Sequence, residues 1–588
     1  MKERWVLHDK QVDFLGIARE LGTEALLVKL MVNRGICDID GMRQFLYGDM
    51  SDLSDAYLMK DLKKACDILC DIANAQDTIA IVSDYDCDGV FSGMILYTGL
   101  KKIGAKPVIF TPDRIKDGYG INRRIIDEIH NKGIRNIITC DNGIAAKDEI
   151  AYAKSLGMTV IITDHHEIPY DESSGVREYI IPAADAVCNP KQEDCGYPYK
   201  HLCGAGVCLR IITTLYDICR IDKNEEKILV AYAAIATVAD IMELTGENRI
   251  IVKEGLKILS ETDNPGLHAI REVNDLLAKK INAYHIGFII GPCFNAAGRI
   301  ESVETAFELL MTDDREKASA LAAKLKEIND IRKSMTEEGA ERAIEIASGE
   351  EYKDKKILVI YLPDCHESLI GIIAGRVKER FYKPCIVFTD AENDTYKGSA
   401  RSIPGYDMFY ELSRVKELFI KMGGHAAAAG MTISKGAFNA LSEKLNANTT
   451  LTDTDLTPVV DIDADVLVRH MTVDVVDKLA ELEPYGNANA KPLFVGRHFN
   501  IRRAVILGKN KNVLKLTVSD REGRVCDAVL FNDIDVFLQH LTDRFGEEEV
   551  QKMMHGARNA TDMALVFNAD VNEYNGLRTV QFVVRHYL

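Results

Sequence analysis

Short apolar runs alternate with amphipathic stretches between residues 60 and 265. The runs "TIAIVS", "NIITC" and "TVIIT" are rich in β-branched residues, and segments with helical spacing such as "DLKKACDILCDIANA" precede them. This alternation is the βαβ rhythm of a doubly wound parallel sheet. The pattern therefore predicts an α/β domain over residues 56–265, with a helical appendage over residues 1–55 before it.

The pattern changes in the second half of the chain. A stretch rich in Ala, Lys, Glu, Leu and Arg without proline, "DDREKASALAAKLKEINDIRKSMTEEGAERAIEIAS", predicts a long helix inside a helical connector over residues 266–350. The runs "KILVIYLPD" and "KPCIVFTD" around a helical segment predict a second α/β domain over residues 351–450. Alternating polar and apolar residues with Gly and Asn turns then predict an OB-like β-barrel over residues 455–588.

Composition is that of an ordinary globular protein of several domains, with 588 residues, 47% hydrophobic and 28% charged. No apolar run reaches membrane-spanning length, and the start "MKERWVLHDK" lacks the apolar core of a signal peptide, so we expect the cytoplasm. The 14 cysteines are scattered, which argues against a disulfide framework or a structural zinc site. A net charge of −18 is only a weak objection to nucleic-acid binding, because a local basic stripe matters more than the total.

Acids and histidines follow four of the apolar runs. They are Asp84, Asp86 and Asp88 after "TIAIVS", Asp141 after "NIITC", Asp164, His165 and His166 after "TVIIT", and Asp240 after "AYAAIATVA". If each run is a strand of one parallel sheet, these side chains converge at one edge, where ligands bind. Carboxylates and imidazoles in this number suit two divalent cations of the Mn, Mg or Zn type, which points to phosphoryl chemistry.

Each motif also has a purely structural interpretation. "SDYDCDGVFSG" could be a polar turn, although alternate positions on an extended strand face the same way. An EF-hand loop is excluded, because the twelfth position counted from Asp84 is Ile95 instead of glutamate. Adjacent His165 and His166 could be structural, but one imidazole can bind metal while the other faces substrate. Asp141 and Asp240 are ambiguous when each is taken alone, because "DNG" is a standard turn and "ADI" could be a helix terminus.

The order D-x-D-x-D-G, D-N-G, D-H-H and T-V-A-D resembles the DHH phosphoesterase superfamily, and most closely its bacterial RecJ exonucleases. The resemblance continues through "DGYGIN", "FNAAGRIES", "IGIIAGRV", "KGSARSI" and "MGGHAAAAGMTI". It implies two Mn²⁺ or Mg²⁺ ions, one held by Asp86 and Asp141 and the other by Asp88, Asp141, His165 and Asp240. It also implies that Asp84 and Asp164 support these ligands and that His166 assists catalysis.

A clamp for a terminal phosphate is implied by the same resemblance, since Arg forks match phosphate geometry. Its candidates are Arg114, Arg299, Ser399 and Arg401, with Gly424 and His425 of a glycine-rich loop and His366 as further substrate-binding residues. A solvated surface Arg or a tight turn is the structural alternative for each. Two departures from the family pattern, Cys293 in place of an Arg and Cys365 in place of a Trp, bear on substrate binding.

The resemblance implies a 5′-to-3′ exonuclease of single-stranded DNA that releases 5′-mononucleotides in DNA repair and recombination. It further implies a monomer that works with single-strand-binding protein and a RecQ-type helicase. One alternative is a phosphodiesterase of short oligonucleotides or cyclic dinucleotides, whose relatives typically lack the long helix and the barrel. Another is a non-catalytic replication scaffold, whose relatives have lost ligands that this chain retains.

Overall fold

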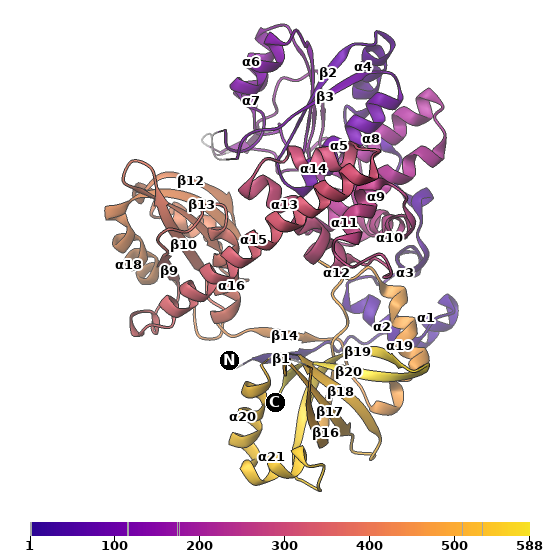
Figure 1. Cartoon of the computed structure of the whole chain (residues 1–588), viewed down its shortest axis with the longest axis vertical. Coiled ribbons are helices and arrows are strands. Elements are labelled where there is room, and N and C mark those ends of the chain that lie inside the picture. Colours follow the sequence, from indigo (N-terminus) through magenta and orange to yellow (C-terminus); the bar gives the residue numbers. More distant parts are fainter. Residues whose placement is uncertain (1–2, 115–116, 173–174, 176, 509, 532) are drawn as a thin grey trace.

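The computed structural model describes residues 3–114, 117–172, 175, 177–508, 510–531 and 533–588. Figure 1 shows two α/β units joined by one long helix, α15 (Arg315–Ala347), and a β-barrel unit below them. At 1.5 Å per residue the 33 residues of α15 span about 50 Å. No helix among the described residues has both the length and the apolar character needed to cross a lipid bilayer.

The first α/β unit is built on a five-stranded sheet in the order β3-β2-β4-β5-β8. All its pairings are parallel, as the βαβ rhythm predicts. The strands are β2 (Thr78–Ser83), β3 (Lys106–Phe110), β4 (Asn136–Cys140), β5 (Thr159–Thr163) and β8 (Ala186–Cys188). Strands β2 and β4 lie in the middle, so the ends of β2, β4 and β5 are neighbours at one edge of the sheet.

Helices cover both faces of this sheet, which makes it doubly wound. One face carries α4 (Leu62–Asn74), α5 (Cys87–Lys102), α8 (Gly204–Cys219) and α9 (Glu226–Ala239) in a single apolar core. The other face carries α6 (Arg123–Asn131) and α7 (Lys147–Ser155) in a second, smaller core. The chain continues through α10 (Gly246–Glu261), α11 (Pro265–Glu272), α12 (Ala283–His285), the π-helical turn η4 (Ile286–Ile290), α13 (Gly291–Ile300) and α14 (Glu304–Met311).

The second α/β unit has a mixed sheet in the order β12-β13-β11-β10-β9. Its strands are β9 (Leu358–Tyr361), β10 (Cys385–Ala391), β11 (Thr395–Arg401), β12 (Phe419–His425) and β13 (Ala428–Ser434). The end of α15 and α16 (Ile370–Phe381) pack on one face, whereas α17 (Met408–Ser413) and α18 (Phe438–Asn448) pack on the other. Thus α15 is at once the connector and part of the core of this unit.

The barrel unit closes on itself, because β16 (Phe494–Leu507) pairs with both β17 (Val513–Ser519) and β19 (Asp562–Tyr574). The circuit is completed by β18 (Val525–Phe531) and β20 (Leu577–Tyr587). Helices α20 (Ile534–Phe545) and α21 (Glu547–Met554) pack against it, and α19 (Val473–Leu479) packs against β19 and β20. The predicted multidomain α/β fold with an OB-like barrel is confirmed.

The N-terminal segment is joined to the barrel unit. Strand β1 (Arg4–Leu7) pairs in parallel with β14 (Val459–Ile462), and α1 (Phe14–Leu21), α2 (Ala25–Asn33) and α3 (Ile39–Tyr47) share one apolar core with the barrel. The guanidinium of Arg249 on α10 is fully buried and donates hydrogen bonds to the carbonyl oxygens of Phe45, Leu482 and Glu481. One side chain of the first α/β unit therefore holds both α3 and the segment that follows α19 against this unit.

Candidate metal centre and anion clamp

Three aspartates surround the junction between β2 and α5. Asp84 follows β2 directly, while Asp86 is the N-cap of α5 and its carboxylate accepts a hydrogen bond of 3.0 Å from Gly89 N. Asp88 lies in the first turn of α5. The expected alternation along an extended strand is therefore wrong for these residues, because the strand ends at Ser83 and a helix cap directs Asp86 and Asp88.

Asp88 is held by the start of a second helix, α8. Its two carboxylate oxygens accept hydrogen bonds of 2.7 Å from Gly204 N and 2.8 Å from Ala205 N. A Cβ at position 204 would lie 2.7 Å from Asp141 Cβ, so only glycine permits this close approach. The N-terminus of α8 thus orients Asp88 and packs closely against Asp141.

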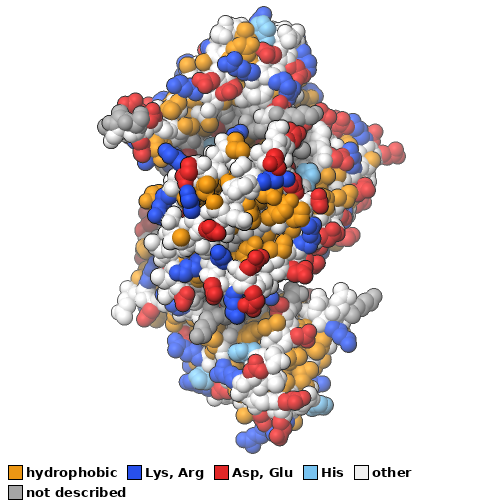
Figure 2. All heavy atoms as spheres, turned by 90° about the vertical axis from the view of Figure 1, so that its left-hand side faces the viewer, with side chains coloured by type: hydrophobic (Ala, Val, Ile, Leu, Met, Phe, Trp, Pro, Cys, Tyr) orange, Lys and Arg blue, Asp and Glu red, His pale blue; other side chains and the backbone are white. Residues whose placement is uncertain are grey.

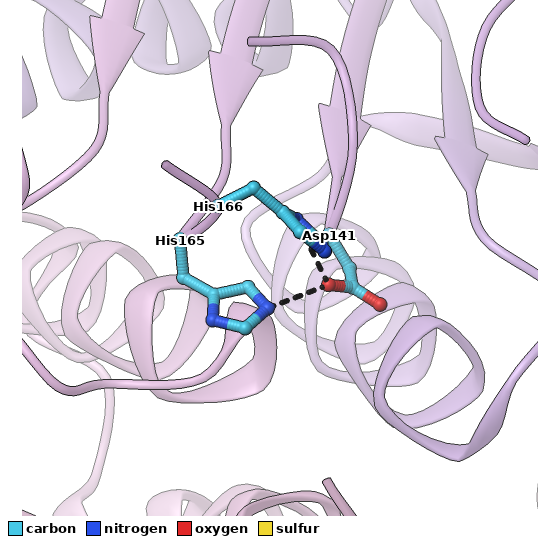
Figure 3. Close-up of side chains that lie close together, drawn as sticks. All are labelled: Asp141, His165 and His166. Atoms are coloured by element: carbon cyan, nitrogen blue, oxygen red, sulfur yellow. Dashed lines mark ion pairs between the residues drawn. The ribbon is translucent and has the colours of Figure 1, made fainter. Parts of the chain in front are cut away.

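Asp141 and the two histidines meet at the ends of β4 and β5 (Figure 3). Asp141 adopts a left-handed backbone conformation, with φ of 60°. One of its carboxylate oxygens, Oδ1, lies 3.1 Å from His165 Nε2 and 3.9 Å from His166 Nδ1. Burial lowers the pKa of His165 to about 4, so its imidazole is neutral and free to bind a metal ion.

Asp164 serves a different purpose, because its carboxylate is saturated with donors from the protein. It accepts hydrogen bonds from His165 N, His166 N, His166 Nδ1 and Ile144 N, at 2.7 to 3.2 Å. Burial opposes its charge, but these bonds outweigh burial and lower the pKa of Asp164. Burial likewise opposes the charge of His166, yet Asp164 raises the pKa of His166 to about 9 and keeps it an imidazolium.

Asp240 reaches the same place from a helix. The run "AYAAIATVA" is the second part of α9, and Asp240 caps the C-terminus of this helix, so the expectation of a strand end is wrong and the alternative of a helix terminus holds. A fully buried apolar run has no periodicity that separates helix from strand. Asp240 Oδ2 nevertheless lies 3.8 Å from His165 Nε2.

This centre contains more carboxylate oxygens than the hydrogen-bond donors of the protein can satisfy. Burial and neighbouring acids raise the pKa values of Asp84, Asp86 and Asp141. Asp84 Oδ1 and Asp141 Oδ1 are buried without a hydrogen-bond partner among the described residues, an arrangement that a cation would relieve. The donor set of hard oxygens with one neutral imidazole fits divalent Mn²⁺ or Mg²⁺.

Three overlapping groups of possible ligands can be distinguished, each with its ligand atoms within 4.8 Å of one another. The first contains Asp84, Asp86 and Asp141, the second contains Asp88, His165 and Asp240, and the third contains Asp141, His165 and His166. The contact between Asp141 and His165 joins them, as expected for a bridging acid. Asp84 belongs to a ligand group by this geometry, whereas the resemblance implied that it only supports other ligands.

Metal binding is expected to release protons and to strengthen with pH. Burial and the charge of Asp88 raise the pKa of Asp240 to about 8, so the metal-free protein holds a proton there at neutral pH. Because a cation binds the carboxylate form, Mn²⁺ affinity should rise by up to about tenfold per pH unit below about pH 8 and level off above it. Calorimetry in buffers of different ionisation enthalpy measures both effects, and a pH-independent affinity would contradict this expectation.

Two arginines of the predicted clamp lie beside the metal centre. The guanidinium of Arg114 stacks 4.9 Å from the ring centroid of Tyr85, which stands between Asp84 and Asp86. Together with Arg299, these residues line a cavity of about 770 Å³. Burial and the charge of Arg114 lower the pKa of Arg299 to about 10, and no carboxylate pairs with Arg299 in the described chain. Such unbalanced positive charge suits an anion.

The second α/β unit supplies the rest of the clamp at the start of α16. Arg299 Nη1 donates a hydrogen bond of 2.7 Å to Ser368 O, and Ser368 Oγ lies 2.7 Å from His366 Nδ1. A Cβ at Gly371 would lie 2.8 Å from Arg401 Nη2 and 2.9 Å from Ser399 Oγ. Glycine in the first turn therefore leaves room beside two polar groups and the amides of a helix N-terminus, a favourable seat for phosphate.

Gly424 and His425 lie farther along the same sheet. His425 and Arg401 both pair with Ala428 from opposite sides, so they occupy one row across three strands. At about 4.8 Å between strands, the two residues are about 10 Å apart. This spacing places His425 beyond the phosphate seat. His366 is closer, because it contacts Ser368.

Sequence reasoning missed three residues of this region. Tyr119 donates a hydrogen bond of 2.6 Å from its hydroxyl to Asp141 O and lies 3.2 Å from His166 Nδ1. The side-chain oxygen of Asn295 accepts a hydrogen bond of 2.9 Å from Cys87 N. This bond attaches α13 to the metal loop, the segment that carries Asp84, Asp86 and Asp88. Arg332 on α15 adds positive charge near Arg299. Tyr119 and Asn295 stood inside motifs already singled out, but nothing distinguishes Arg332 within a regular charged helix.

The two departures from the family pattern have different surroundings. Cys293 is buried, and its thiol donates to Ile289 O at 3.2 Å, so it belongs to the packing around α13. Cys365 is half-buried beside His366. Figure 2 shows acidic and basic side chains intermingled over one face of the molecule, so anion binding depends on local features such as the clamp.

Comparison with known proteins assigns each unit to a family. Residues 78–239 match the DHH family, N-terminal domain, residues 354–450 match the DHHA1 domain, and residues 462–586 match the RecJ OB domain. The chain is 31% identical over 606 residues to the single-stranded-DNA-specific exonuclease RecJ of Escherichia coli, with 99% of each chain covered. It belongs to the RecJ family.

Other RecJ proteins agree with this assignment. The Bacillus subtilis RecJ is 33% identical over 593 residues, which cover 99% of this chain and 70% of that protein. The crystal structure of Thermus thermophilus RecJ in complex with Mn²⁺ has a TM-score of 0.80 and 23% identity, covering 100% of this chain and 79% of that one. The two proteins therefore share the RecJ fold over the whole length of this chain.

Proposed function

We propose that this RecJ-family chain is a metal-dependent exonuclease of single-stranded DNA that works from the 5′ end. It releases 5′-mononucleotides and acts in DNA repair and recombination. The observation that carries the proposal is the convergence of five aspartates and a neutral histidine on one edge of a parallel sheet, beside arginines without acidic partners.

Asp86, Asp88, Asp141, His165 and Asp240, joined by Asp84, would hold two divalent cations, Mn²⁺ or Mg²⁺. Such cations supply an activated water and neutralise charge on the phosphate. Asp141 would contribute to both cation sites, and the amides of Gly204 and Ala205 keep Asp88 in place.

His166 would act on the substrate rather than on a cation. Its Nδ1 is held by Asp164 at 2.8 Å, and its side chain is 44% exposed, so Nε2 is available to donate a hydrogen bond to a phosphate oxygen. The raised pKa keeps the proton on His166 at neutral pH. The imidazolium would therefore stabilise the negative charge that develops during hydrolysis.

The clamp would determine the direction of cleavage. Arg114, Arg299, Ser399 and Arg401 would bind the 5′-terminal phosphate, and Asn295 fixes α13 directly to the metal loop. A terminal phosphate held one nucleotide away from the cations would make each cleavage release a mononucleotide. His366, Gly424 and His425 would contact the strand on either side of this seat.

A second function was considered, namely hydrolysis of short oligonucleotides or cyclic dinucleotides. The barrel and the long helix α15 favour a longer substrate, since OB barrels commonly bind oligonucleotides. A scaffold without catalysis is disfavoured, because the described structure retains every proposed ligand in position.

End-labelled substrates test the proposal. With Mn²⁺, a single strand of about 20 nucleotides carrying a 5′-phosphate label should release labelled mononucleotide at once, whereas a 3′ label should appear only in long products. Cleavage of a dinucleotide without cleavage of the long strand would contradict the proposal. Release of the 3′ label first would refute the direction alone.

The remaining expectations follow from the family resemblance. We propose that the chain acts in the cytoplasm as a monomer, with single-strand-binding protein and a RecQ-type helicase as partners that deliver single strands. Sedimentation of the purified protein and pull-down with each partner test these statements.

A further inference from the structure

Two aromatic rings are exposed on the helical segment that precedes α13. Tyr284 is 61% exposed and Phe288 is 72% exposed. The rings stack on each other, with centroids 4.9 Å apart and planes inclined by 24°. Large apolar groups gathered in water mark a binding surface when something on the protein specifies what covers them.

A continuous helical segment leads from this pair to the phosphate clamp. Helix α12, the turn η4 and α13 follow one another without a break from Ala283 to Ile300. Tyr284 and Phe288 are exposed, and positions 292, 295 and 299 farther along this segment are half-buried. The segment therefore joins Tyr284 and Phe288 to Asn295 and Arg299.

Positive charge accompanies the aromatic pair. Lys279 and Lys280 precede it, both are exposed, and neither has a carboxylate partner in the described part of the chain. The sequence "KKINAYHIGF" thus places cations next to exposed rings. This combination suits single-stranded nucleic acid, whose phosphates need cations and whose bases offer flat faces.

The pair also lies between the metal centre and the barrel unit. Turn η4 packs on the end of α9, since a Cβ at Gly287 would lie 3.6 Å from Val238 Cγ1, two residues before Asp240. Ile241, which follows Asp240, is 72% exposed and has φ of 57°. Its carbonyl oxygen accepts a hydrogen bond of 2.8 Å from Nδ2 of Asn487, a residue that precedes the first long strand of the barrel. Figure 1 shows α12 on the side of the first α/β unit nearest β14 and the barrel.

We propose that Tyr284 and Phe288 form a stacking platform for bases of single-stranded DNA, on the 3′ side of the nucleotide held by the clamp, along α12 and α13. The inference rests on the proposed exonuclease function. Bases of a duplex are stacked inside the helix and present no free face, so the platform selects unpaired strands. Lys279 and Lys280 bind the adjacent phosphates.

The platform makes a length-dependent prediction. Fifteen residues of helix separate Tyr284 from Arg299, or about 22 Å. At about 3.4 Å per stacked nucleotide this corresponds to roughly six nucleotides. A strand of four nucleotides held by its 5′ end should not reach the rings, whereas a strand of about 20 nucleotides should cover them.

The test is degradation of 5′-phosphorylated strands of about 4 and about 20 nucleotides with Mn²⁺. For the double variant Tyr284→Ala/Phe288→Ala we expect KM for the long strand to rise about tenfold, with kcat and the short-strand kinetics unchanged. The conservative variant Tyr284→Phe/Phe288→Trp should match the wild type. Tyr57→Ala, an exposed ring on the η2 turn (Ala56–Leu58), is the matched control.

Each outcome has a distinct meaning. Equal losses on both strands would overturn the platform in favour of a structural role, and unchanged kinetics on both would overturn it in favour of another use of the surface, such as a protein partner. Quenching of 2-aminopurine near the sixth position of an uncleavable strand, lost in the alanine variant, would support stacking independently of turnover. Failure of the wild type to degrade either strand would refute the proposed function itself.

Discussion

Asp141→Asn is expected to reduce exonuclease activity about a thousandfold, the effect of losing several kcal/mol of stabilisation from bound cations. Asp141 belongs to two of the three ligand groups, and its Oδ1 lies 3.1 Å from Nε2 of His165, a member of the remaining group. Asparagine has nearly the same shape but no charge, so the fold should persist while both cations are weakened. The measurement is kcat/KM on a single strand at saturating Mn²⁺.

The same substitution should raise the stability of the metal-free protein. Burial and the charges of Asp88 and Asp86 raise the pKa of Asp141 well above its ordinary value. A carboxyl group whose pKa rises on folding destabilises the folded state above the unfolded pKa of about 3.9, so it does so at pH 7. Metal-free Asp141→Asn should therefore melt about 2–4 °C higher than the wild type, and Mn²⁺ should no longer raise its Tm.

Asp77→Asn is the matched control for both measurements. Asp77 immediately precedes the same strand, β2, that Asp84 follows, and it is exposed at the opposite edge of the sheet. Activity and Mn²⁺-dependent Tm should remain at the wild-type level. If Asp141→Asn retained full activity, or if Mn²⁺ stabilised it as strongly as the wild type, Asp141 would not be a ligand.

Arg401→Gln is expected to reduce kcat/KM on 5′-phosphorylated strands by about 10- to 100-fold. The guanidinium is partly buried beside Gly371 and Ser399, and a hydrogen bond to a charged group contributes about 1.5–3 kcal/mol. Strands with a 5′-hydroxyl lack the phosphate that Arg401 would bind, so their kcat/KM should fall by less than about threefold. The ratio between the two substrates is the quantity to measure.

Arg380→Gln is the control for the clamp, because Arg380 is exposed in the last turn of α16, the helix whose first turn faces Arg401. It should leave the ratio unchanged. Gly371→Ala offers an independent variant, since its Cβ would occupy the space between Arg401 and Ser399 and should reproduce the selective loss. A uniform loss on both substrates in Arg401→Gln would mean that Arg401 does not bind the terminal phosphate.

Much of the fold was predictable because hydrophobic periodicity is strong in the βαβ unit and in α15. The sequence did not, however, predict whether the element before Asp240 is a helix or a strand. Residues 231–237 of the run "AYAAIATVA" are buried on all sides of α9, so they carry no signature that distinguishes helix from strand. The position of Asp240 at the end of that element was predictable even though the element itself was misassigned.

Site chemistry was predictable where neighbouring residues of one motif act together, as in His165 and His166. The opposite pKa shifts of the two imidazoles depend on how deeply each is buried and on the charge of Asp164. Four hydrogen-bond donors keep Asp164 charged. The clamp joins residues about 100 positions apart through Ser368 and the start of α16, and short-range patterns carry no information on such contacts. Only the family resemblance connected those residues in advance.

The most direct test of the metal centre is a crystal structure of the protein soaked with Mn²⁺, using anomalous scattering to locate the ions. The account predicts two peaks about 3.5–4 Å apart on either side of the Asp141 carboxylate, one near Asp86 and the other near His165 and Asp240. A single peak, or peaks that do not contact Asp141, would contradict the two-cation mechanism.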